Sequence, residues 1–181
     1  IYDPDIETRP TAEQFDIDRA SYRRQVRYLM ENSAFYQSKL QAAGFSSVED
    51  VGELDDIARL PFTEKDELRK TQAAAPPFGE HLSCPPEDLL RVFSTSGTTG
   101  VPCYLGLTRN DIDMYATNVA RGYSAAGFSE GQRIVVVVNA GPFVAGAVYY
   151  GFDKIGCTVI PFDGELLARG EAEVDAAHGL D

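Results

Sequence analysis

The segment Thr95–Gly100 combines the residue types that surround phosphate groups in proteins. Four hydroxyl side chains and two glycines fall within these six residues. Glycine allows tight turns that expose main-chain N–H groups, and hydroxyls add further donors that can wrap an anion or reach a magnesium ion. These residue types can form a phosphate site at Thr95, Ser96, Gly97, Thr98, Thr99 and Gly100.

Two familiar phosphate motifs do not explain this segment. No Gly-Lys-Ser/Thr follows at the spacing of a Walker loop, and GxGxxG is absent. A hairpin turn rich in serine, threonine and glycine would have the same composition. Composition alone leaves the turn and the phosphate site equally open.

The elements before this segment are predicted to be helices. Apolar residues recur at helical spacing from Phe15 to Met30, Asn32-Ser33 interrupts the pattern, and a short second helix ends near Gly44. Thr63–Asp66 is typical of a capped helix start, for a helix through Lys70. The proline-rich stretch 75–86 is predicted to be a loop or linker, so residues 1–88 form an N-terminal helical region.

The pattern changes after residue 88. Strands are expected at 89–94, 104–107, 134–138 and 157–162, and helices after Thr108 and after Gly141-Pro142. This order predicts an α/β fold in which the N-terminal helices precede a mostly parallel βαβαβ sheet, with 134–138 buried on both faces. The subdomain 89–181 ends in a polar, acidic stretch with no closing element, so we expect an incomplete fold.

Charge argues against nucleic acid as a general partner. The net charge is −12, with −7 in residues 1–93, zero in 94–162 and −5 in 163–181. An acidic surface repels phosphate backbones, but a small anion can still bind the neutral middle.

The sequence also argues against a membrane protein, a disulfide-rich protein and a histidine–cysteine metal site. The longest apolar run, Ile134–Val138, is far shorter than the roughly 20 residues that span a bilayer, so we expect no membrane span. Three widely spaced cysteines fit the reducing cytoplasm rather than a disulfide framework. With His81 and His178 as the two histidines, we expect no metal site built from histidine and cysteine.

The segment Ser96-Gly97-Thr98-Thr99-Gly100-x-Pro102 resembles the phosphate loop of the adenylate-forming superfamily, which includes acyl-CoA synthetases, luciferases and adenylation domains. Further segments, from about Phe15 to Gly164, resemble the phenylacetate-CoA ligase branch. They are Asn32–Tyr36, Leu60–Arg69, Thr108–Asp111 and Gly156–Pro161.

The resemblance implies a two-step reaction with ATP, Mg²⁺ and coenzyme A. A small carboxylic acid, expected to be aromatic, attacks the α-phosphate of ATP and releases pyrophosphate, and the thiol of coenzyme A then displaces AMP. Thr95 to Gly100 would hold the phosphates. Phenylacetate-CoA ligases often have a lysine at the position of Val101, and the wider superfamily often has one at the position of Cys103. This chain has neither lysine, so its loop has no cation of its own.

In the resembled family, the stretch that corresponds to Asn139–Phe143 borders the acyl pocket. Gly141 and Phe143 would therefore line that pocket, with Phe143 as an aromatic wall. The alternative is an ordinary core aromatic residue at a helix start. Cys103 is interpreted as a small apolar residue at a strand start rather than a nucleophile.

Members of the resembled family are more than twice as long as this chain. We therefore expect the N-terminal part of a ligase that is inactive alone. Its candidate partners are a missing C-terminal segment or a second copy of the chain in a homodimer. A non-catalytic module that binds nucleotide or a partner, or one half of a split enzyme, is the alternative. A carrier protein could replace coenzyme A as acceptor. Neither the acid, the acceptor nor the oligomeric state follows from the sequence.

Overall fold

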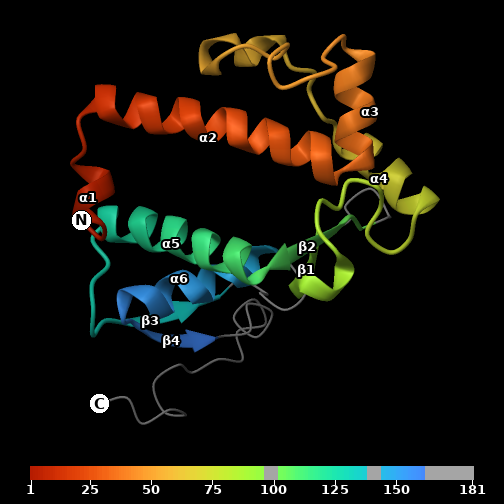
Figure 1. The fold of residues 1–181 in the computed structure, drawn as a ribbon. Coiled ribbons are helices and arrows are strands. Elements are labelled where there is room, and N and C mark those ends of the chain that lie inside the picture. The colour runs from red at the N-terminus through yellow and green to blue at the C-terminus, as the bar shows by residue number, and fades with distance from the viewer. Residues whose placement is uncertain (96–101, 138–143, 162–181) are drawn as a thin grey trace. The chain divides into compact units, whose positions relative to one another are not determined.

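The computed structural model describes residues 1–95, 102–137 and 144–161 in two compact units (Figure 1). The first unit contains residues 3–110, and the second contains residues 1–2 and 111–181. The first unit therefore extends past residue 88. The division at residue 88 remains a proposal about domains.

Helices build most of the first unit, as expected. In chain order they are α1 (Pro4–Glu7), α2 (Thr11–Asn32), α3 (Ala34–Ala42), the 3-10 helix η1 (Leu54–Arg59), α4 (Lys65–Ala74) and the 3-10 helix η2 (Pro86–Asp88). In Figure 1 the chain changes direction sharply between α2 and α3. The buried side chains of the two helices and the following loop form one core, which consists of Tyr22, Val26, Leu40, Phe45 and Val51.

Ser33 separates α2 from α3, at the predicted break. Its main-chain N–H closes α2 on the carbonyl of Leu29 at 3.1 Å, and its Oγ accepts the Tyr36 N–H at 3.4 Å to cap α3. The same hydroxyl donates to the carbonyl oxygen of Glu80 at 3.1 Å. One buried serine therefore ends a helix, starts the next and fixes a distant loop.

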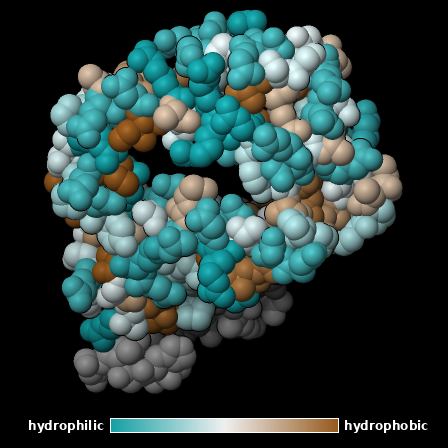
Figure 2. All heavy atoms as spheres, in the orientation of Figure 1, coloured by the Kyte–Doolittle hydropathy of each residue, from teal (hydrophilic) through white to brown (hydrophobic). Residues whose placement is uncertain are grey.

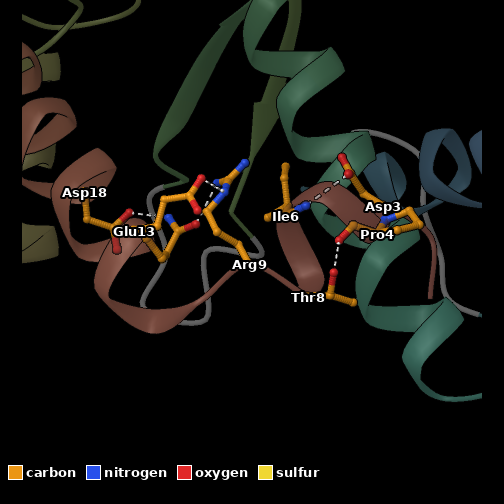
Figure 3. A network of polar contacts seen from close by, with 8 residues as sticks. Asp3, Pro4, Ile6, Thr8, Arg9, Glu13 and Asp18 are labelled. Carbon is orange, nitrogen blue, oxygen red and sulfur yellow. Dashed lines mark hydrogen bonds and ion pairs between the residues drawn. The ribbon is translucent and has the colours of Figure 1, made fainter.

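Two groups of polar contacts lie at α1 and at the start of α2 (Figure 3). Thr8 Oγ1 donates to the carbonyl of Pro4 at 2.7 Å at the end of α1. Beyond it, Arg9 donates to Gln14 at 2.8 Å, and Gln14 donates to Asp18 at 2.7 Å along the first turns of α2. These contacts hold the turn between the two helices.

A capping box begins α4 one residue after the expected position. The Glu64 N–H donates to the Glu67 carboxylate at 2.7 Å. Lys39 Nζ donates to both oxygens of that carboxylate at 2.6 Å, which ties α3 to α4. The Lys39 side chain is 12% exposed, so this ion pair is partly shielded from water.

Strands β1 (Leu89–Ser94) and β2 (Tyr104–Thr108) form an antiparallel hairpin in the first unit. The residues 95–103 connect them, nine in number. A parallel pair needs a crossover of about a dozen residues or more, so this short connection requires antiparallel pairing. The expectation of one mostly parallel sheet is therefore wrong for these two strands.

The second unit has the expected parallel arrangement. The chain continues through α5 (Arg109–Ala125), β3 (Arg133–Val136), the 3-10 helix η3 (Val144–Ala147), α6 (Val148–Ile155) and β4 (Thr158–Pro161). β3 and β4 pair in parallel, from Arg133 opposite Thr158 to Val136 opposite Pro161. The α/β class with leading helices is confirmed, although the described strands form two separate two-stranded sheets.

The core of the second unit lies on one face of β3. Ile134 and Val136 are buried against residues of α5 and α6 that include Ala120, Phe152 and Ile155. Val135 is 49% exposed, so the expectation that both faces of this strand are buried is wrong in the part of the chain that the structure describes. Side-chain alternation along the strand places Val135 on the opposite face from its neighbours.

Hydrophilic side chains cover most of the face drawn in Figure 2, with hydrophobic residues scattered between them. Within the three described ranges, no helix combines the length and apolarity needed to cross a membrane.

Candidate functional site

The two ends of the predicted phosphate loop are described, whereas most of the loop is not. Thr95 is the described member of the predicted phosphate site. The other predicted site residues lie outside the described residues, and their roles remain predictions. They are Ser96, Gly97, Thr98, Thr99, Gly100, Gly141 and Phe143.

Thr95 and Cys103 close the base of the connection between β1 and β2. The Thr95 N–H donates to the Cys103 carbonyl at 2.9 Å, and the Cys103 N–H donates to Thr95 Oγ1 at 3.1 Å. A hydroxyl oxygen can accept one bond while its own hydrogen donates elsewhere. Thr95 therefore extends the hairpin by one pair and retains a donor for an anion.

Cys103 is buried at the start of β2, with 1% of its surface exposed. Its position fits the interpretation as a small apolar residue. A nucleophilic thiolate needs an exposed, electropositive setting, which this position does not provide.

Gln72 on α4 contacts the residues that follow the predicted loop. Its Nε2 donates to the Pro102 carbonyl at 3.2 Å, and its Oε1 accepts the Tyr104 N–H at 2.9 Å. Sequence reasoning missed Gln72, because its partners are 30 or more residues away and no local pattern links them.

His81 also contacts Tyr104, and it forms a polar pair with α4. Its Nδ1 lies 2.7 Å from Thr71 Oγ1, and its ring forms a hydrogen bond with the main chain of Tyr104. Burial lowers the pKa of His81 below its ordinary value of 6.5, and the bond to Tyr104 opposes that shift without cancelling it. In the sequence analysis His81 entered only as one of two histidines that are too few for a metal site.

The shifted pKa of His81 predicts a pH dependence of stability. The unfolded chain binds the proton more readily than the folded chain, so the contribution of neutral His81 is complete above pH 6.5 and is lost as pH falls below it. We expect the free energy of unfolding to fall between pH 7 and 5, and His81→Asn to flatten that fall. Urea unfolding at several pH values measures both.

The carboxylates of Asp50 and Glu67 do not interfere in that window. Main-chain N–H groups of Ser47 and Glu64 hold their pKa values below the ordinary values of 3.8 and 4.5. An equal pH slope in the wild-type protein and His81→Asn would contradict the assignment to His81.

The donor set of residues 95–100 suits phosphate oxygens better than a metal ion. It offers hydroxyls and main-chain N–H groups and no carboxylate, whereas magnesium is usually held through one or two carboxylates together with phosphates. In the described part of the chain, no group of three or more His, Cys, Asp or Glu residues is arranged to hold a metal ion. Magnesium therefore does not fit as a resident ion of these residues.

Comparison with known proteins relates this geometry to a family. No protein-family profile matches the chain. The chain is 35% identical over 170 residues to phenylacetate-coenzyme A ligase of Thermus thermophilus, a match that covers 93% of this chain and 37% of that protein. It is 39% identical over 140 residues to the enzyme of the same name from Escherichia coli, covering 77% of this chain and 31% of that protein.

The chain matches the N-terminal part of the phenylacetate-CoA ligase branch. It spans about a third of the length of the curated relatives it matches.

Solved structures of a CoA ligase also match this chain. A 2-hydroxyisobutyryl-CoA ligase in an open conformation, in complex with 2-HIB-AMP and CoA, superposes with a TM-score of 0.80 at 29% identity. That match covers 88% of this chain and 37% of the ligase. The same ligase in its thioesterification state gives 0.81 at 31% identity over 88% of this chain and 34% of the ligase. The resemblance inferred from the sequence motifs is confirmed.

Proposed function

We propose that this chain forms the N-terminal part of an ATP-dependent carboxylic acid–CoA ligase. The acid carboxylate attacks the α-phosphate of ATP, pyrophosphate leaves, and the thiol of coenzyme A displaces AMP to give a thioester. The main support is the structural similarity to 2-hydroxyisobutyryl-CoA ligase, which matches 88% of this chain. That ligase was solved in complex with the acyl-adenylate 2-HIB-AMP and CoA.

Residues 95–100 would hold the ATP phosphates in the first step. Main-chain and hydroxyl donors stabilise the negative charge that moves onto the leaving pyrophosphate, and such preorganised donors are strong contributors to catalysis. The neutral stretch 94–162 does not repel the nucleotide. Because the loop has Val101 and Cys103 instead of a lysine, these donors carry more of the binding. Magnesium would enter with ATP rather than as a resident ion.

We propose an aromatic acid as the substrate, with Gly141 and Phe143 at its pocket. The names of the sequence relatives, at 35–39% identity, support an arylacetic acid. The structural neighbours at 29–31% identity act on a short hydroxy acid, which makes that acid the first competitor to test. The buried thiols of Cys103 and Cys157 support the cytoplasm as its location. A homodimer is a further proposal, which size-exclusion chromatography would test.

Acid-dependent exchange between ATP and pyrophosphate in the full gene product tests the proposal. The panel would contain phenylacetate, benzoate, 2-hydroxyisobutyrate and acetate, each with MgATP. We expect exchange to be highest with an aromatic acid, and thioester to form when coenzyme A is added. A polypeptide of these 181 residues should show no exchange, because it covers about a third of its relatives.

The same assay separates the alternative functions. Tight MgATP binding without exchange for any acid would favour a nucleotide-binding module. Exchange without thioester formation on coenzyme A would favour a carrier protein as acceptor. Exchange by the 181-residue polypeptide alone would contradict the assignment of this chain as only one part of the catalytic machinery.

A further inference from the structure

The main-chain edge at Tyr104 needs a partner from outside the hairpin. Ser94 and Tyr104 face each other, and the hydrogen bonds across the hairpin next to them join Thr95 and Cys103. Because hydrogen-bonded and non-hydrogen-bonded pairs alternate in antiparallel strands, the Tyr104 N–H points away from β1. Such an outward N–H on a strand edge remains unpaired unless another group covers it.

Gln72 covers this edge with one side chain. Its Oε1 accepts the Tyr104 N–H at 2.9 Å while its Nε2 donates to the Pro102 carbonyl at 3.2 Å. A side-chain amide has the donor and the acceptor of a peptide group, so it replaces a residue of a neighbouring strand. A glutamate carboxylate has no hydrogen-bond donor, and a methionine side chain has neither an N–H donor nor a carbonyl acceptor. Neither residue can therefore make both contacts.

The helix that carries Gln72 is itself held in place. The capping box of Glu64 and Glu67 fixes the start of α4, and Lys39 ties Glu67 to α3. Thr71, adjacent to Gln72, is buried and contacts His81. The support beneath the Gln72 amide is therefore a packed helix rather than a loop.

We propose that Gln72 is a positioning residue for the phosphate loop, which fixes the residues at which the chain returns from that loop. This inference rests on the proposed function. Pro102 directly follows residues 96–101, and the Thr95–Cys103 bonds link the two ends. Holding Pro102 and Tyr104 against α4 fixes the described end of the segment that carries the proposed phosphate donors. Catalysis is sensitive to small errors in the position of such groups.

Kinetics of the full gene product test this role. Gln72→Met is expected to raise the KM for MgATP or lower the exchange rate by about tenfold, the value of one or two hydrogen bonds, with the KM for the acid unchanged. Gln37→Met is the matched control, because Gln37 is exposed on α3. A decrease of equal size in the control, or an equal rise in both KM values, would overturn the inference.

Amide hydrogen exchange provides a readout that does not depend on activity. The Tyr104 amide should exchange faster in Gln72→Met and remain protected in Gln72→Glu, which keeps the acceptor for Tyr104. Both variants should show the roughly tenfold effect on ATP–pyrophosphate exchange, because both release Pro102. Slow Tyr104 exchange in Gln72→Met overturns the inference whatever the activity. If the wild-type protein lacks ATP–pyrophosphate exchange while Tyr104 behaves as expected, the proposed function fails and the contact itself is established.

Discussion

Phe152→Ala is expected to lower the free energy of unfolding of the second unit by about 3–5 kcal/mol. Phe152 on α6 is 3% exposed. Removing a buried ring loses its transfer free energy and leaves a cavity that the surrounding side chains fill only in part. Because whole domains are stable by only about 5–15 kcal/mol, this loss would remove a large share of the unit's stability.

The surroundings of Phe152 explain why the loss should be large. Its ring centroid lies 4.5 Å from that of Tyr123 and 5.6 Å from that of Phe128, so one ring joins α5 and the loop after it to α6. Close helix packing leaves little room for relaxation. At Gly151 a Cβ would overlap the side chain of Val119 and lie 3.2 Å from the Ala120 nitrogen. A glycine is therefore required where α6 meets α5.

Hydrogen exchange measures this effect separately in each unit. Amides of β3, β4 and α6 should lose protection in Phe152→Ala, while those of α2 and α3 retain it. Phe62→Ala is the matched control, because Phe62 is 92% exposed and its truncation should change stability by no more than about 0.5 kcal/mol. Unchanged protection in β3 and α6 would show that Phe152 does not hold this core together.

Local sequence signals predicted the helices well because their causes are local. The break at Ser33 and the start of α4 follow from caps that span three or four residues. Strand pairing depends instead on distant residues. The short connection 95–103 by itself implies antiparallel pairing, and the hairpin-turn interpretation of this segment is consistent with it.

In the candidate site, too, local features could be predicted from the sequence and long-range contacts could not. The phosphate loop could be predicted because its glycines and hydroxyls lie together in the sequence, and it stays a prediction. Gln72 and His81 were missed, because their partners at Pro102 and Tyr104 become neighbours only after folding. The hairpin turn and the phosphate site were treated as competing interpretations, yet they are compatible, since the predicted loop connects the two strands of a hairpin.

Thr98→Val in the full gene product is expected to lower acid-dependent ATP–pyrophosphate exchange by about 100-fold or more. Valine keeps the shape of threonine and removes the hydroxyl. Removing one donor from a preorganised set around developing negative charge typically costs about 10²–10³ in kcat. The loop of this chain lacks a lysine, so no cation within it replaces the lost donor. Steady-state exchange with varied MgATP and fixed acid measures the change.

The matched control for Thr98→Val is Thr117→Val on α5. Thr117 is half-buried, and its hydroxyl donates to the Asp113 carbonyl within the same helix at 2.9 Å. Its loss should leave exchange close to that of the wild-type protein. If Thr98 acts on phosphate, the decrease should affect kcat or the KM for MgATP and leave the KM for the acid unchanged. Full activity of Thr98→Val would instead favour the hairpin-turn interpretation for this position and leave phosphate binding to the glycine N–H groups and the remaining hydroxyls.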